Sequence, residues 1–194
     1  MNLPYCLLMC LCFAMLGVDG CGYRVLTLDR IPEVKGGRPL GAIPPMKFGL
    51  HEFGDSRPFE FVYLQPPRHF IVTPKPTQIV EQAIEKELVR NGHTVVRSGD
   101  FTAVDVLIEG SVTMFAVPLQ SGFTAHGVVE ARIATTPTRA PGEPLIKTYR
   151  GVDPSGVGFL DLKGLLSGAL TEMVKEFTTD PEFLDRITKT KKSP

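Results

Sequence analysis

The amino-acid sequence predicts an α+β domain, a two-layer sandwich in which a mostly antiparallel sheet carries two helices on one face. Apolar residues recur at helical spacing in two stretches, residues 77–90 and 161–178. Between these stretches, segments of alternating apolar and polar residues are separated by turns rich in glycine and proline. The order of strand, helix, several antiparallel strands and second helix therefore predicts both helices on the same side of one sheet.

Length, charge and cysteine usage narrow the class of protein. The 194 residues suffice for one domain with a proper core plus appendages. Twenty-one Lys and Arg balance twenty-one Asp and Glu, so the formal net charge is zero and no global field favours nucleic acid as a partner. All four cysteines lie within the first 21 residues, so the body must be held together by its core and not by disulfides.

The first 20 residues have the pattern of an export signal peptide. Residues 3–18 are uncharged and apolar, but a stable bilayer span needs about twenty such residues. The tetrapeptide Val18-Asp19-Gly20-Cys21 resembles the lipobox of bacterial lipoproteins, which implies cleavage before Cys21 and acylation of its thiol. The alternative is ordinary signal cleavage nearby, which would leave Cys21 as a free surface thiol.

The segment after the cysteine is expected to be a tether. Residues 21–45 contain scattered glycine and proline, and only residues 23–28 suggest a short strand. Fully extended, a tether of this length would reach about 80 Å. The folded domain is expected to span residues 46–188, followed by a solvated basic tail over residues 189–194.

The first part of the domain alternates strand signals with breaks. Residues 46–51 alternate apolar and polar side chains, which predicts a strand with one buried face. The FGDSRP segment that follows contains Asp55 and Arg57, which at a strand end could bind an anion or a partner carboxylate. The alternative is a local Asx-type turn closed by a salt bridge between the two side chains. Residues 59–76 contain four prolines and predict a long surface connection, in which FEFVYL, residues 59–64, could pair at a sheet edge.

The two helices and the strands between them follow from periodicity. Thr77 is the predicted N-cap of the first helix, which ends at Asn91-Gly92. Its predicted buried face comprises Ile79, Val80, Ala83, Ile84, Leu88 and Val89, and its polar face comprises Glu81, Gln82, Glu85 and Lys86. Strands are expected within 93–98, 105–117, 126–136 and 145–152, with three inward residues in the third of them, Val129, Ala131 and Ile133. A short last helix is expected at PEFLDRI.

A search for catalytic or metal-binding patterns yields no candidate. His51, His69, His93 and His126 lie in separate predicted elements and lack the spacing of a helical zinc motif. The GVDPSGVG segment departs from a nucleophile elbow at both glycine positions. Cys6, Cys10 and Cys12 are embedded in apolar sequence without neighbouring His, Asp or Glu. We therefore expect no catalytic residues, no bound metal and no cofactor.

Several segments together resemble one lipoprotein family. An EKEL-containing helix that ends in Arg-Asn-Gly is followed by VDVLIEGSV, KTYRG, GLLSGALTEMVKEF and TTDPEFLDRI. With the Asp55-x-Arg57 turn and the lipobox, this order is similar to that of the YajG-type family of bacterial lipoproteins, over about two thirds of the chain. The resemblance implies an envelope lipoprotein that faces the periplasm. It implies no reaction, because no activity is attached to the family's motifs.

The sequence thus predicts a non-catalytic lipoprotein fastened to the membrane through a lipid on Cys21. Gly22 directly after the cysteine resembles the pattern for delivery to the outer membrane, on its periplasmic face. An envelope protein is the expected partner of such an interaction or assembly module. The alternatives are a carrier of lipid or glycan between sheet and helices, and an envelope hydrolase. An apolar cavity between residues 165 and 177 and the sheet would favour a lipid carrier.

Overall fold

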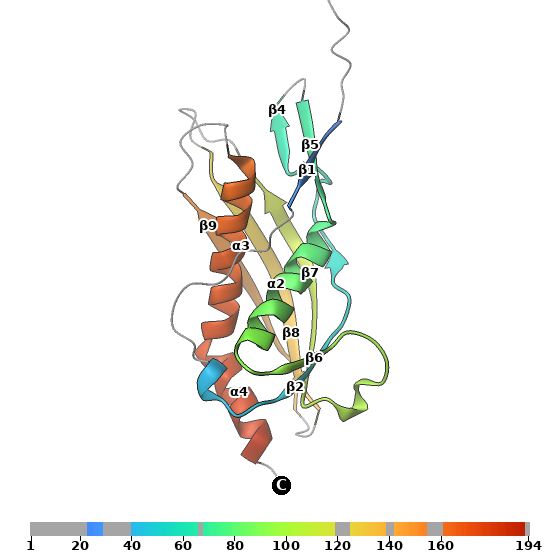
Figure 1. Cartoon of the computed structure of the whole chain (residues 1–194), viewed down its shortest axis with the longest axis vertical. Coiled ribbons are helices and arrows are strands. Elements are labelled where there is room, and N and C mark those ends of the chain that lie inside the picture. The colour runs from blue at the N-terminus through green and yellow to red at the C-terminus, as the bar shows by residue number, and fades with distance from the viewer. Residues whose placement is uncertain are drawn as a thin grey trace, which may run out of the picture.

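The chain folds as an α+β body with sheet on one side and helices on the other. The computed structural model describes residues 23–28, 40–65, 68–118, 125–138, 142–154 and 161–192. The predicted signal peptide, the lipobox and Cys21 lie outside these ranges. Figure 1 shows an elongated molecule in which the helices lie over one face of the long strands. The predicted fold class is confirmed.

The main sheet is mixed, because its long strands are antiparallel and its short strands are parallel to their neighbours. The strand order is β6-β2-β7-β8-β9, and β3 also pairs with β7. The β7–β8 and β8–β9 pairs are antiparallel, whereas β2 runs parallel to both β6 and β7. The strand bounds are β2 (Lys47–Leu50), β3 (Gly54–Asp55), β6 (Thr94–Val96), β7 (Val106–Ala116), β8 (Gly127–Pro137) and β9 (Leu145–Asp153).

In the described part of the chain, three helices cover this sheet, namely α2 (Pro76–Arg90), α3 (Leu162–Thr179) and α4 (Pro181–Lys192). Helix α2 begins earlier than predicted, with Lys75 and not Thr77 at the capping position. Pro76 can occupy the first turn because its missing N–H needs no partner there. The predicted end is confirmed, since Asn91 is the C-cap and Gly92 has a φ of 88°. Helix α4 continues through most of the segment that was expected to be a solvated tail.

A second, small sheet occupies one end of the molecule. It consists of β1 (Tyr23–Thr27), β5 (Arg68–Thr73) and β4 (Tyr63–Gln65), in the order β1-β5-β4. The expectation of a surface connection over residues 59–76 was therefore wrong, whereas the strand pairing considered for FEFVYL is present in part, as β4. The prolines flank these strands and do not interrupt them, so the ladder keeps its donors. Val62 joins the two sheets, because its N–H donates to the Phe70 carbonyl and its carbonyl accepts from the Val117 N–H.

The described parts of the predicted tether belong to the folded body. All five residues of β1 pair in register with β5, and the Leu28 N–H donates to the Thr73 carbonyl at 3.0 Å. The short 3-10 helix η1 (Leu40–Ala42) buries Leu40 completely. The strand expected at residues 23–28 is thus present. Leu26 and Leu28 pack on the core, a contact that the scattered glycines and prolines of the segment gave no reason to expect.

The core lies between the main sheet and the helices. The three residues of β8 predicted to face inward, Val129, Ala131 and Ile133, are at most 1% exposed. The apolar stripe of α3 from Leu165 to Phe177 is buried in the same cluster. Two assignments on α2 were wrong, since Val89 is 53% exposed and Glu81 is only 7% exposed. Glu81 can be buried because its carboxylate accepts a hydrogen bond from the Phe53 N–H.

Helix α3 rests directly on the strands because glycines face it. A Cβ atom on Gly151 of β9 would overlap the Ala169 carbonyl oxygen, and one on Gly127 of β8 would overlap the Leu165 carbonyl oxygen. A close backbone approach of this kind is a common reason for glycine inside a strand. The two glycines therefore set the distance between the helical layer and the sheet.

Candidate functional site: a polar cleft beside the first helix

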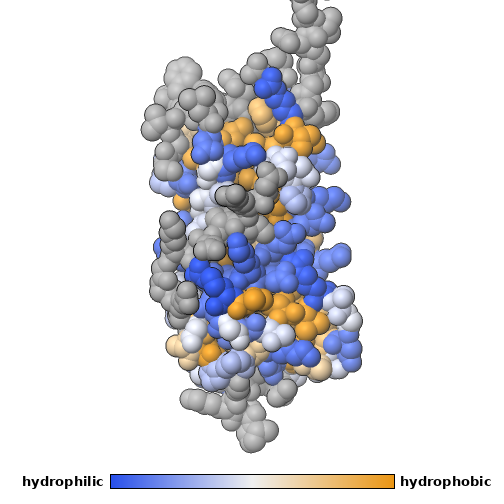
Figure 2. Space-filling view, in the orientation of Figure 1, coloured by the Kyte–Doolittle hydropathy of each residue, from blue (hydrophilic) through white to orange (hydrophobic). Residues whose placement is uncertain are grey.

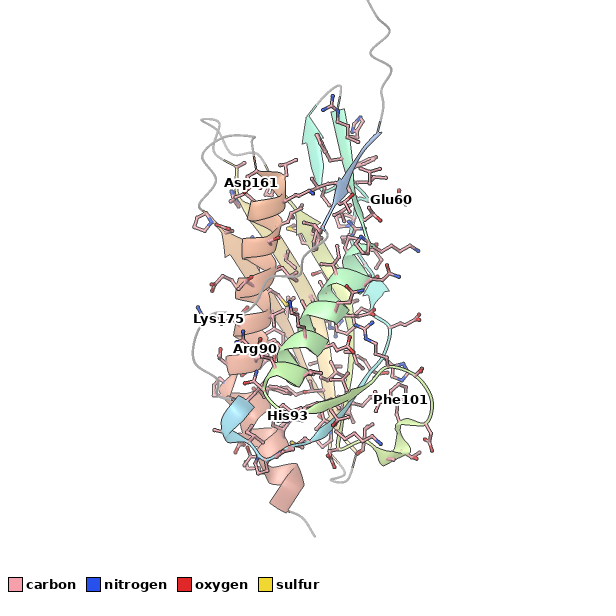
Figure 3. All side chains as sticks on the ribbon, viewed as in Figure 1. Glu60, Arg90, His93, Phe101, Asp161 and Lys175 are labelled. Carbon is pink, nitrogen blue, oxygen red and sulfur yellow. The ribbon has the colours of Figure 1, made fainter. Side chains whose placement is uncertain are left out.

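The candidate site is a cleft of about 940 Å³ at the start of α2. Its walls are the segment after β2, the end of β5 and the first turns of α2. Figure 2 shows hydrophilic side chains gathered across the middle of the helical face, over α2. Glu60, one of the residues that line the cleft, lies beside β5 of the small sheet in Figure 3. The cleft is thus bounded by both sheets and by one helix.

Asp55 and Arg57, the two residues predicted to bind a ligand or to close a turn, line this cleft and pair with each other. Arg57 Nε and Nη2 donate to the two carboxylate oxygens of Asp55 at 2.9 and 2.8 Å, and the Arg57 N–H donates to Asp55 Oδ1. Arg57 Nη1 also donates to the Glu60 carbonyl at 3.3 Å. The hydrogen bond from Arg57 holds the pKa of Asp55 below its usual value. The geometry is that of the local turn, the second of the two predicted roles, and binding by this pair stays a prediction.

Glu81 is a functional candidate that sequence reasoning missed. Its Oε1 accepts the Phe53 N–H at 2.7 Å, and its Oε2 lies 3.7 Å from Arg97 Nη1. Arg97 Nε is also 2.7 Å from a carboxylate oxygen of Glu85. A buried carboxylate is costly unless it is paired in this way. Its burial could have been expected from its position three residues before Ile84, because residues three apart lie on the same side of a helix and Ile84 is fully buried.

The charges of the cleft nearly cancel. Its lining includes the carboxylates of Glu52, Asp55, Glu60 and Glu81 and the cations of Arg57, Lys75 and Arg97. Arg57 pairs with Asp55, and Arg97 pairs with Glu81. Among the described residues that line the cleft, there is no histidine and no cysteine. The arrangement offers hydrogen bonds and paired charges to a polar ligand or to a partner chain.

The histidines are not brought together by the fold. His93 is buried, accepts the Met46 N–H at its Nδ1 and packs edge-on against Phe48. His51 contacts the ring of Phe101, and His69 contacts the ring of Phe61. Within the part of the chain that the structure describes, no group of His, Cys, Asp and Glu could hold a metal ion. The same part contains no helix long and apolar enough to cross a membrane.

A second polar cluster joins β9 to the junction of α3 and α4. Asp180 accepts hydrogen bonds from the Tyr149 hydroxyl at 2.7 Å, from Lys147 Nζ at 3.1 Å and from the Glu182 N–H at 3.0 Å. Burial tends to raise the pKa of Asp180, but the hydrogen bonds from Tyr149 and Lys147 outweigh burial and lower it. Burial raises the pKa of the Tyr149 hydroxyl. The cluster holds the helical layer to the sheet.

Comparison with known proteins identifies the fold but no family. No family model and no curated protein matches the chain. Among solved structures, protein XCC0632 from Xanthomonas campestris, of the DUF330 family, matches with a TM-score of 0.57 and 11% identity, over 87% of this chain and 96% of that one.

Two further matches are weaker. Lipoprotein GNA1162 from Neisseria meningitidis gives a TM-score of 0.41 and 12% identity, over 68% of this chain and 99% of that one. A PelC dodecamer from Paraburkholderia phytofirmans gives a TM-score of 0.45 and 14% identity, over 68% of this chain and 85% of that one. The expected YajG-type family is not shown by these comparisons. The chain thus shares its fold with the Xanthomonas protein.

Proposed function

We propose that this chain is a non-catalytic envelope lipoprotein, anchored through Cys21 to the periplasmic face of the outer membrane, that serves as an interaction or assembly module. The observation that carries the proposal is the position of strand β1 in the chain. Strand β1 starts two residues after Cys21 and pairs over its whole length with β5. A lipid on Cys21 would therefore be joined almost directly to a packed strand, and not to a loose end.

The cleft supports a role in binding. Its most enclosed charged groups, Glu81 and Arg57, are held by neighbours inside the same cleft. Groups fixed in this way are suited to recognise a polar surface by shape and hydrogen bonding. A partner protein of the envelope is the occupant that best fits a membrane-anchored module of this kind.

A glycan-binding role is the second candidate, favoured by the polar lining and size of the cleft. A lipid between sheet and helices is less well supported. The residues that would line such a cavity, from Leu165 to Phe177 on α3, belong to the packed core cluster.

The anchor is tested by changing the acylated residue. Cys21→Ser should move the protein from the membrane fraction to the soluble periplasmic fraction, because a cysteine thiol is required for attachment of the lipid. The matched control is Asp19→Ala, which keeps the cysteine and should leave the protein with the membranes. Intact-mass spectrometry of the wild-type protein should show cleavage before Cys21 and added acyl mass. A Cys21→Ser protein that stays with the membranes would overturn the proposal.

A further inference from the structure

We propose that the end of the molecule formed by the small sheet, on which Val25 is exposed, lies against the lipid headgroups of the bilayer. This inference rests on the proposed acylation of Cys21. Two residues of chain span at most about 7 Å, which is close to the thickness of one headgroup layer. Because Tyr23, the first paired residue of β1, is only two residues from the lipid-bearing Cys21, the connection is too short to hold the small sheet far from the membrane.

The small sheet is firmly attached to the rest of the body. Strand β1 pairs with β5 along all five residues, and Leu28 beyond it is buried. Leu26, Phe70 and Val72 pack against the core from the inner face of this sheet. The position of β1 therefore fixes the position of the whole domain relative to its anchor.

The opposite face of the small sheet carries an exposed apolar side chain, Val25, beside the polar Thr27 and His69. Side chains alternate along a strand, so Val25 points away from the core that its neighbour Leu26 contacts. Val25 is 60% exposed, and its register partner on β5 is the half-buried Ile71. Phe59, in the connection that leads to β4, is 64% exposed. Exposed apolar side chains next to a lipid anchor are suited to the interfacial layer of a bilayer.

The shape of the molecule sets the orientation that follows. Figure 1 places β1, β4 and β5 at one end of the long axis and α4 at the other. Arg186 of α4 donates to the Glu143 carbonyl, just before β9, so the start of β9 also lies at the α4 end. The α4 end would then project away from the bilayer. Ile71 also lines the polar cleft, so the cleft would lie beside the membrane surface.

The test uses the absence of cysteine from residues 22–194. Val25→Cys is compared with Ile146→Cys, a matched position on β9 that is 47% exposed and lies at the α4 end. Each mature, acylated protein is labelled with a thiol-reactive fluorophore and reconstituted into vesicles of phosphatidylethanolamine and phosphatidylglycerol that carry nitroxide-labelled lipid. Circular dichroism verifies that each variant is folded.

We expect the label at position 25 to be quenched about threefold more strongly than the label at position 146, because nitroxides act within the interfacial layer. Equal quenching at the two positions would overturn the inference. So would weak quenching at position 25 together with disulfide crosslinking between the thiols introduced at that position in two chains, which would identify a second copy of the chain as the occupant.

The lipid anchor itself is tested separately, by labelling and flotation of the wild-type protein. Acylated Cys21 has no free thiol, so wild-type protein should take up no fluorophore and should float with the vesicles. Uptake of the label, or failure to float, would overturn the proposed function itself. Flotation without preferential quenching at position 25 would overturn only the docking of the small sheet.

Discussion

At the scale of single residues, the buried carboxylates show how this domain accommodates charge. Glu81 and Asp180 are each 7% exposed, and each accepts hydrogen bonds from neighbours far away in the sequence. Removing one partner of such a group leaves the other without a hydrogen bond in a place that water does not reach. These residues should therefore contribute more to stability than the exposed ion pairs on the helices.

Asp180→Ala should lower the free energy of unfolding by about 3 kcal/mol, since the Tyr149 hydroxyl loses its acceptor and α4 loses a cap. The matched control is Asp185→Ala on α4, whose side chain is 57% exposed and pairs with Lys189. Its loss should stay below about 1 kcal/mol. Urea unfolding followed by circular dichroism measures both. Equal losses would contradict a special role for Asp180.

The contribution of Asp180 should also depend on pH. Its pKa in the folded protein is below the ordinary value of 3.8, so its contribution is fully present above that value and is lost as the pH falls through the folded pKa. The difference in unfolding free energy between wild type and Asp180→Ala should therefore shrink between about pH 5 and about pH 2.5, values chosen to bracket the ordinary pKa of about 4. Urea titrations at these two pH values test this, and a difference that grows towards low pH would contradict the sign.

At the scale of elements, the contact of α3 with the sheet depends on the strand glycines. Gly151→Ala should destabilise the protein by about 3 kcal/mol, because the new methyl group meets a backbone carbonyl that cannot rotate away. Gly142→Ala is the control, since a Cβ at this position meets no other atom within 4 Å. Thermal unfolding of the two variants provides the comparison. Similar midpoints would show that α3 can shift without cost.

The same scale shows which elements could be predicted from sequence. The long strands β7, β8 and β9 and the helices α2 and α3 each repeat their own period over many residues, and all were predicted within a few residues. The strands β4 and β5 have three and six residues and adjoin prolines, and β5 was not predicted. A short strand acquires its stability from its neighbours, so local sequence carries little signal for it.

At the scale of the whole molecule, the small sheet determines how far the domain stands from its anchor. Inserting about twenty Gly and Ser residues between Gly22 and Tyr23 adds a flexible linker with a mean span of about 25 Å. The protein should remain with the membranes and unfold at the same urea concentration. In the Val25→Cys variant that carries this linker, quenching of the label by nitroxide lipid should fall to the level seen at position 146. Quenching that persists would show that the short connection is not what holds the small-sheet end of the molecule against the bilayer.

The candidate site could be predicted only in part. The residues Asp55 and Arg57 were found because a charged pair after a strand is visible along the chain. Glu81 and Arg97 were not, since the pairing of the two side chains and the hydrogen bond from Phe53 to Glu81 join segments that are far apart in sequence. The YajG-type resemblance and the acylation of Cys21 remain predictions that the experiments above address.

Local periods of apolar side chains were enough to predict the fold class, the two long helices, the long antiparallel strands and the inward residues of β8. That β1 belongs to the domain, that β2 runs parallel to its neighbours and that Glu81 is buried became visible only in the folded chain. The physical reason is the same for all three. Strand pairing and the satisfaction of a buried charge depend on partners that only the folded chain brings into contact.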